Sequence, residues 1–259
     1  MTLYLARRLA RRVAAKYRVI LSDVMAGLYL HGSMTLGGFN DGSDIDFLVV
    51  TGSEPSQTQK EAMIRLLLDL DGEAPEKGFE MSVVLLKDTL APRHPIGYSL
   101  HFSNAHKKRA ADDLSLYCSE MNGRDPDLAA HFTVAGLFGE ELIGPPPGRV
   151  FAPVPRGDYI DSVISDVAGA MTDILRDPVY VTLNLCRAVA ACEKGLVLSK
   201  QDGAVWGLSE MPNEYSPLIR AAAGLYLTGE SGIPAYKLPI SGWDGFAGYC
   251  LKRLSPYMK

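Results

Sequence analysis

The segment Gly144-Pro145-Pro146-Pro147-Gly148 restricts the fold more than any other feature of this chain. Three consecutive prolines supply no backbone N–H donors, so neither a helix nor a central strand can run through them. The segment therefore predicts a domain boundary, with residues 1–150 in one domain and residues 151–259 in a second. A chain of 259 residues, 47% of them hydrophobic, is long enough for two domains that each bury a core.

Helix and strand patterns alternate before the proline segment. Apolar residues at helical spacing predict helices at residues 4–18 and 57–70. Alternating or wholly apolar runs predict strands at residues 25–31, 44–50 and 79–86. Residues 112–144 read as mostly helical. This order predicts an α/β domain whose sheet is covered by helices on one side.

Only helical patterns follow the proline segment. They cover residues 158–175, 178–194, 200–210 and 214–227. Asp177 before Pro178 is a helix start, Gly195 suits a left-handed helix end, and Ser199 with Asp202 resembles a capping box. We expect an all-α helical bundle as the second domain.

Composition excludes several classes of protein. The net charge of −4 and the pI near 5.8 argue against a dedicated nucleic-acid-binding protein, although the arginine-rich first helix leaves a local basic patch open. No apolar run has the roughly 18 residues of a membrane span, and the start lacks the apolar core of a secretory signal. The four cysteines form no CxxC pair, so we expect reduced thiols and no zinc site. A cytoplasmic monomer is the prediction.

Two aspartates at the start of an apolar strand carry the chemistry. Asp44 and Asp46 flank Ile45 and, on a strand, project from the same face. Such a pair repels itself unless a cation neutralises it, and Mg²⁺ is commonly held by one or two carboxylates together with substrate phosphates. Alone, the pair could equally cap a turn. We interpret Asp44 and Asp46 as Mg²⁺ ligands and catalytic residues because of the residues around them.

A glycine-serine turn comes shortly before the aspartates. Gly32 and Ser33 end the predicted first strand, eleven residues before Asp44 when counted from the serine. Glycine removes the Cβ that would block a phosphate, and backbone N–H groups and a hydroxyl can then approach it. Ser43 offers a second hydroxyl on the other side of the loop. These residues predict a nucleotide-binding site.

A third carboxylate lies on the next predicted strand. There Phe79, Met81 and Val83 alternate toward the core, so Glu80 faces the same side as the paired aspartates. A carboxylate in this place can take the proton from an attacking hydroxyl, or can bind a metal itself.

The motifs resemble those of a known family. Gly32-Ser33, Asp44-Ile45-Asp46 and Glu80 are similar to the core of polymerase-β-type nucleotidyltransferases. In the second half, DPVYVTLNLCR, GLVLSKQDGAVW and MPNEYSPLIR resemble the helical domain of the aminoglycoside adenylyltransferases that inactivate spectinomycin and streptomycin. The resemblance extends from about Leu28 to Tyr226. It implies a polymerase-β-like α/β nucleotidyltransferase domain followed by an all-α bundle.

The resemblance also implies roles for further residues. Asp44 and Asp46 would bind Mg²⁺, Glu80 would be the base, and Arg187 with Lys200 would hold the phosphates of ATP. Asp173 and Asp177 would bind the acceptor, where carboxylates suit the amino groups of aminoglycosides. Arg187 and Lys200 could instead pair with surface carboxylates, and Asp177 could serve only as a helix cap.

The acceptor side departs from the family pattern. Enzymes that accept both drugs carry two tryptophans that pack on streptomycin, and this chain has Ala105 or His106 and Ala168 at those places. Tyr180 replaces a family histidine among the acceptor-binding residues. The resemblance therefore implies spectinomycin rather than streptomycin as the acceptor.

The sequence thus predicts a Mg²⁺-dependent adenylyltransferase that moves AMP from ATP to a hydroxyl of a small aminoglycoside-type molecule and releases pyrophosphate. Two alternatives stay open. The acceptor could be a non-antibiotic compound, a protein or an RNA, or the chain could be a catalytically silent nucleotide-binding regulator.

Overall fold

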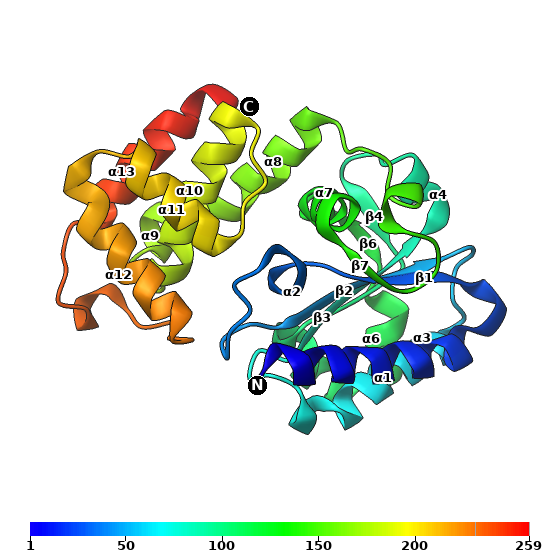
Figure 1. Cartoon of the computed structure of the whole chain (residues 1–259). Helices are drawn as coiled ribbons and strands as arrows, with labels where there is room; N and C mark the ends of the chain where they lie inside the picture. Colours follow the sequence, from blue (N-terminus) through cyan, green and yellow to red (C-terminus); the bar gives the residue numbers. More distant parts are fainter. Residues whose placement is uncertain (231, 259) are drawn as a thin grey trace. The chain divides into compact units, whose positions relative to one another are not determined.

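The structure of this chain, a computed structural model, describes residues 1–230 and 232–258 (Figure 1). The chain divides into two compact units, Met1–Val154 and Pro155–Lys259. The boundary between the two compact units therefore falls after Val154, whereas the proline segment predicts a domain boundary after Val150. The extent of the functional domains stays a prediction.

The first unit is built on a five-stranded mixed sheet of strand order β5-β3-β2-β1-β7. The strands are β1 (Met25–Leu30), β2 (Ile45–Thr51), β3 (Phe79–Leu85), β5 (Leu100–Phe102) and β7 (Glu140–Ile143). Only β2 and β3 pair in parallel, and the other neighbours in this sheet are antiparallel. Strands β4 (Ile96–Tyr98) and β6 (Gly123–Asp125) form a separate antiparallel pair. The central strand β2 is buried along its whole length, as its apolar run predicts.

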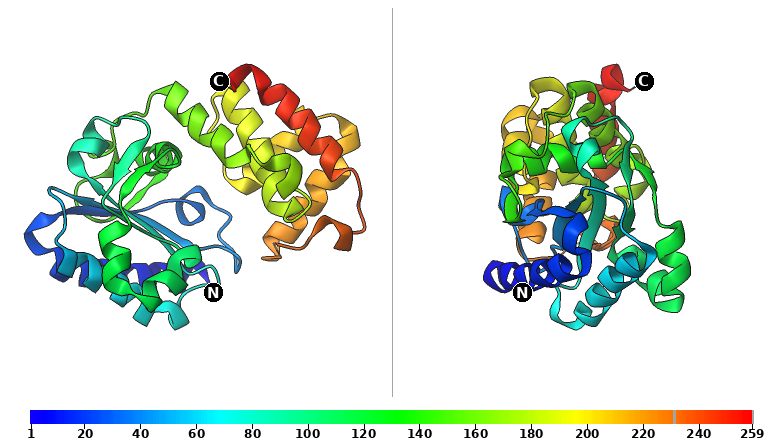
Figure 2. Two further views of the ribbon diagram at one scale, coloured as in Figure 1. Left: turned by 180° about the vertical axis from the view of Figure 1, so that it is seen from behind. Right: turned by 90° about the vertical axis from the view of Figure 1, so that its right-hand side faces the viewer.

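Helices cover both faces of this sheet (Figures 1 and 2). One face packs against α1 (Leu3–Leu21), α3 (Gln57–Asp69) and α6 (Leu114–Glu120). The other carries Tyr29 and Leu48, which pack with Phe132 of α7 (Leu128–Phe138) and with Phe151. We predicted cover on one side only, which is wrong. The reason is that α7 is almost wholly apolar and buries itself against the second face.

The remaining elements of this unit are short. They are the helices α2 (Ser33–Leu36), α4 (Leu86–Leu90) and α5 (Lys107–Asp112). Strands β6 and β7 lie within residues 112–144, which we predicted to be mostly helical. Each strand has only three or four residues, too few for a period of two to be visible in the sequence.

The second unit is wholly helical among its described residues. Its helices are α8 (Arg156–Val167), α9 (Ala170–Asp173), α10 (Pro178–Lys194), α11 (Lys200–Glu210), α12 (Ser216–Leu227) and α13 (Trp243–Leu254). Helix α10 is the central element, and α8, α11, α12 and α13 all pack on it. An α/β domain followed by a helical bundle is therefore the observed fold, as predicted.

Local signals placed two of these helices correctly. The Asp177 carboxylate accepts the Tyr180 backbone N–H at 3.0 Å, and Gly195 ends α10 with φ +67°. The Ser199 hydroxyl accepts the Asp202 N–H at 3.0 Å at the start of α11. The caps at Asp177, Gly195 and Ser199 are confirmed, whereas the Asp202 carboxylate of the expected capping box accepts the Ser199 hydroxyl at 2.7 Å.

Two helical predictions were incomplete. The helix expected over residues 158–175 is broken around Gly169, where an added Cβ would lie 2.3 Å from an Asp173 carboxylate oxygen. Helix α13 was missed because Gly245 and Gly248 weaken its helical propensity. Trp243 at its start is a buried core residue.

In the described residues, no helix is both long and apolar enough to pass through a lipid bilayer. The four cysteines are free and buried, as predicted.

Candidate active site

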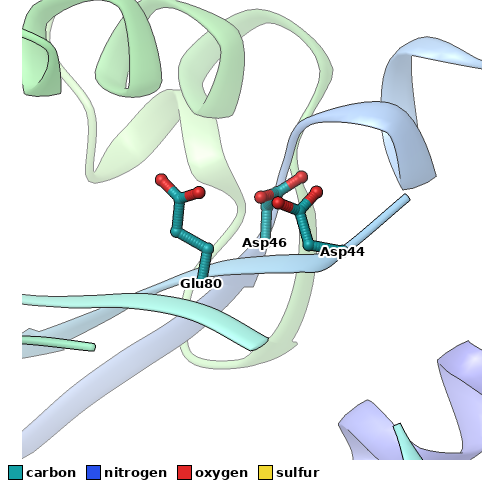
Figure 3. A group of neighbouring side chains, drawn as sticks. All are labelled: Asp44, Asp46 and Glu80. Atoms are coloured by element: carbon teal, nitrogen blue, oxygen red, sulfur yellow. The ribbon is translucent and has the colours of Figure 1, made fainter. Parts of the chain in front are cut away.

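Three carboxylates meet at the beginning of β2 and β3 (Figure 3). Asp44 directly precedes β2, and Asp46 within β2 pairs in parallel register with Glu80 of β3. One carboxylate oxygen from each of the three residues lies within 4.8 Å of the other two. The side chains project from the same side of the strands. The structure thus brings together the three acidic residues predicted from the sequence, in an arrangement whose oxygens can hold a divalent cation.

Gly32 makes room for one of these carboxylates. It lies between β1 and α2 with φ +63° and ψ −144°, a backbone conformation that is essentially limited to glycine. A Cβ on Gly32 would lie 2.0 Å from the Asp46 Oδ2. The His31 backbone N–H donates to the Asp46 carbonyl oxygen at 3.1 Å, which ties the two strands together at this point. The glycine of the glycine-serine turn is therefore required by the Asp46 carboxylate.

Replacing Gly32 by alanine should damage both the fold and the site. We expect Gly32→Ala to lower the free energy of unfolding by about 1–3 kcal/mol because of its backbone conformation, and to move the Asp46 carboxylate. Chemical denaturation measures the first effect. Gly72→Ala is the control, because nothing lies within 4 Å of its added Cβ. Equal stability of the Gly32→Ala protein and the parent would contradict the backbone conformation of Gly32 and its close packing against Asp46.

The two predicted serines differ in their surroundings. The Ser33 Oγ is buried, and no described residue forms a hydrogen bond with it. A buried hydroxyl without a partner is costly and would gain from a ligand acceptor. The Ser43 hydroxyl accepts the Asn40 N–H at 3.1 Å, and the Ser43 N–H donates to the Asn40 carbonyl at 3.0 Å, so Ser43 closes the loop before Asp44. Its contact with a nucleotide stays a prediction.

A histidine that the sequence analysis did not select lies beside the triad. His131 of α7 has its Nε2 3.2 Å from the Asp127 carboxylate and 3.8 Å from Glu80 Oε1. Its ring centroid lies 4.8 Å from that of buried His31. His131 is the one histidine in a helix sequence that is otherwise apolar except for Thr133. It comes four residues after Asp127, and this pattern was the available signal.

The charges of these groups are coupled. Burial by itself would lower the pKa of His131, but the carboxylates of Asp127, Glu80 and Asp46 outweigh it and raise that pKa to about 10. Burial raises the pKa of Glu80, and the imidazolium of His131 opposes this shift. Burial and the charge of His131 together hold the pKa of His31 well below its usual range. A cationic His131 therefore balances part of the negative charge of the triad.

The helical unit holds the two predicted phosphate-binding cations close to each other. Arg187 of α10 donates from Nε to the Leu198 carbonyl at 2.9 Å, just before α11 begins. Lys200 is the first residue of α11, directly after its cap. The Arg187 side chain also lies against Gly203, where an added Cβ would be 2.7 Å from Arg187 Cγ. A lysine, an arginine and a helix N-terminus together suit an anion such as phosphate.

The helical unit also contains a pocket of about 230 Å³. Asp173, Asp177 and Tyr180, the three predicted acceptor-binding residues, all line it. Asp166 and Asn184 line it too and were not predicted. Asp166 lies in the last turn of α8, just before a break between α8 and α9 that the sequence pattern did not reveal.

Comparisons with known proteins agree with this fold. Residues 7–97 match the family model described as the nucleotidyltransferase domain, and residues 149–239 match the aminoglycoside adenylyltransferase C-terminal domain. The acidic triad on a mixed sheet and the first of these matches define a nucleotidyltransferase. Because the second domain matches as well, the chain belongs to the aminoglycoside adenylyltransferase family.

Individual relatives are distant but cover most of the chain. The aminoglycoside (3'') (9) adenylyltransferase of Klebsiella pneumoniae is 27% identical over 213 residues, which cover 80% of each sequence. The spectinomycin 9-adenylyltransferase of Staphylococcus aureus is 26% identical over 246 residues, 93% of this chain and 88% of the relative. The crystal structure of the spectinomycin adenyltransferase AAD(9) from Enterococcus faecialis with ATP and spectinomycin superposes with a TM-score of 0.76. It has 18% identity and covers 96% of this chain and 98% of that one.

Proposed function

We propose that this enzyme transfers an AMP group from Mg·ATP to a hydroxyl of an aminoglycoside-type small molecule, spectinomycin rather than streptomycin, and releases pyrophosphate. The observation that carries the proposal is the convergence of Asp44, Asp46 and Glu80 within 4.8 Å. The relatives named for this activity support it, since they cover most of the chain.

The acidic residues fit a divalent cation. Asp44 and Asp46 would hold Mg²⁺, because their oxygens lie close together and Gly32 leaves room for the Asp46 carboxylate. Bound Mg²⁺ would polarise the phosphates of ATP and neutralise charge as pyrophosphate leaves. The hydroxyl of Ser33 and the backbone of Gly32 would bind phosphate oxygens, and Ser43 would contribute from the adjoining loop.

Glu80 would act on the acceptor. Its carboxylate would take the proton from the acceptor hydroxyl while the hydroxyl oxygen forms a bond to the α-phosphorus of ATP. The bond between the α-phosphorus and the bridging oxygen of pyrophosphate breaks, and that oxygen keeps the electron pair. The products are O-adenylylated acceptor, pyrophosphate and a protonated Glu80, which returns its proton to water.

The helical unit would bind both substrates. Arg187 and Lys200 would hold the phosphates of ATP, and Asp173, Asp177 and Tyr180 would bind the acceptor. A pocket lined by several aspartates suits the amino groups of an aminoglycoside-type molecule. Ala168 is small and follows the pocket-lining Val167, so it offers no aromatic surface on which streptomycin could pack. This supports spectinomycin as the acceptor.

One assay tests the proposal. The purified protein is incubated with Mg·ATP and with spectinomycin, streptomycin or other aminoglycosides. The molecular mass of each product is then measured by mass spectrometry. We expect spectinomycin to gain one AMP group and streptomycin to remain unchanged. Labelling of protein or RNA by radioactive ATP, with no drug modified, would show a different acceptor. Nucleotide binding without any transfer would show a silent regulator.

Gly203 provides a test of the phosphate-binding cations. Alanine at this position must displace Arg187, so we expect Gly203→Ala to raise the KM for ATP at least about threefold. The gain in helix propensity, about 1 kcal/mol, should offset part of any loss of stability. Steady-state kinetics measures the effect, with Gly245→Ala in α13 as the control because its Cβ enters open space. An unchanged KM for ATP in Gly203→Ala would count against Arg187 as a phosphate-binding residue.

A further inference from the structure

One face of α10 carries a line of polar side chains between the acceptor pocket and the two phosphate-binding cations. Tyr180, Asn184 and Arg187 follow one another at helical spacing. Tyr180 and Asn184 both line the pocket, although most of the helix around them is apolar and buried. Polar residues at these places need a reason beyond core packing.

Tyr180 contacts both the pocket wall and the Lys200 ammonium. Its hydroxyl donates to the Asp166 carboxylate at 3.0 Å, in the wall of the pocket. Its ring lies beneath the Lys200 ammonium, whose Nζ is 4.7 Å from the ring centroid. The centroid of the Tyr226 ring lies 5.7 Å from the same Nζ. Lys200 is therefore held by aromatic faces, and one of them belongs to the pocket wall.

Asn184 likewise contacts both the pocket and the second cation, Arg187. Its side chain is 3% exposed and lines the pocket. Its Oδ1 accepts a hydrogen bond from Arg187 Nη1 at 3.0 Å. Together with the Leu198 carbonyl that accepts from Nε, this bond fixes the plane of the guanidinium. The pocket wall thus touches both cations through two neighbouring side chains of one helix.

We propose that Tyr180 and Asn184 are positioning residues that join acceptor binding to nucleotide binding, each forming part of the acceptor pocket while it holds one of the cations that bind ATP. The inference rests on the proposed function, which assigns Lys200 and Arg187 to the phosphates. An acceptor that binds to the pocket wall contacts the side chains that orient these cations. Specificity for the acceptor and affinity for ATP are then set by the same residues.

Paired variants separate this role from simple packing. Tyr180→Phe keeps the ring beneath Lys200, and Tyr180→Leu removes it. We expect Tyr180→Phe to retain the parent's affinity for a non-hydrolysable ATP analogue with Mg²⁺, while Tyr180→Leu weakens it roughly two- to fivefold. Tyr180→Phe should raise the KM for spectinomycin, because the hydrogen bond from the Tyr180 hydroxyl to Asp166 in the pocket wall is lost. Tyr236→Leu is the matched control, since this 82% exposed tyrosine also lies near a lysine ammonium but away from the pocket residues.

Asn184 is tested by a double-mutant cycle. Asn184→Leu has a similar volume but cannot accept from Arg187, and we expect it to weaken binding of the analogue about fivefold or more. In an Arg187→Ala background the same substitution should have no further effect, because the group that it positions is gone. A merely structural role would leave the two effects additive. Thermal melting checks that each variant is folded.

The outcomes distinguish the inference from the proposed function. Analogue binding by calorimetry needs no acceptor, so weaker binding in the two leucine variants supports the inference even if no drug is adenylylated. Binding equal to that of the parent in both variants would overturn the inference and leave AMP transfer intact. If the parent protein binds no analogue, both the inference and the proposed function fail.

Discussion

Asp46→Asn should abolish AMP transfer. We expect kcat/KM to fall by about a thousandfold or more, because asparagine keeps the shape of the side chain but removes the charge that would hold a divalent cation beside ATP. Asp46 is 9% exposed, lies against Gly32 and pairs with Glu80 across the parallel strands, so its carboxylate is held in place within the triad. Release of pyrophosphate with spectinomycin as acceptor measures the loss.

The fold should survive this substitution. Removing one of three crowded carboxylates relieves repulsion, so the melting temperature of Asp46→Asn should equal or exceed that of the parent. Asp23→Asn, at an exposed aspartate before β1, is the matched control and should keep full activity. A folded Asp46→Asn protein that transfers AMP at the parent's rate would contradict the role of Asp46.

Glu80→Gln should separate chemistry from nucleotide binding. We expect kcat to fall about a hundredfold to ten-thousandfold, because glutamine cannot accept the proton of the acceptor hydroxyl. The KM for ATP should stay within roughly twofold of the parent's value, since Asp44 and Asp46 remain in place. Steady-state kinetics with ATP and spectinomycin varied in turn gives both constants.

The matched substitution for Glu80→Gln is Glu141→Gln. Glu141 is an exposed glutamate on β7 in the same sheet, and its loss should leave both constants unchanged. If Glu80→Gln turned over as fast as the parent, another group would have to be the base. An increase in the KM for ATP with unchanged kcat would instead assign Glu80 to nucleotide binding.

The acidic triad could be predicted because the direction of each side chain follows from its position along a single strand. Alternation along a strand places Asp44 and Asp46 on one face, and the same period places Glu80 on the matching face of its own strand. What the sequence left open was the pairing of the strands, which the structure supplies as a parallel register with Asp46 opposite Glu80. Helices α10 and α11 could be predicted equally well, because the residues that cap them lie next to the helices in the sequence.

The parts that could not be predicted depend on contacts between distant residues. His131 reaches Glu80 only because α7 packs on the second face of the sheet, and no periodicity in α7 says which face it will cover. Strand β7 exists because β1 offers it an open edge, not because four residues favour a strand. Asp166 of α8 lines the pocket together with residues of α9 and α10, so its place there depends on how these helices pack.

A crystal grown with Mn²⁺ and a non-hydrolysable ATP analogue tests the central claim most directly. Anomalous scattering locates the manganese without reference to any assumed chemistry. We predict a peak bound by the carboxylates of Asp44 and Asp46, beside Glu80 and in contact with the phosphates. A nucleotide bound with its metal elsewhere, and no peak at these carboxylates, would contradict the account.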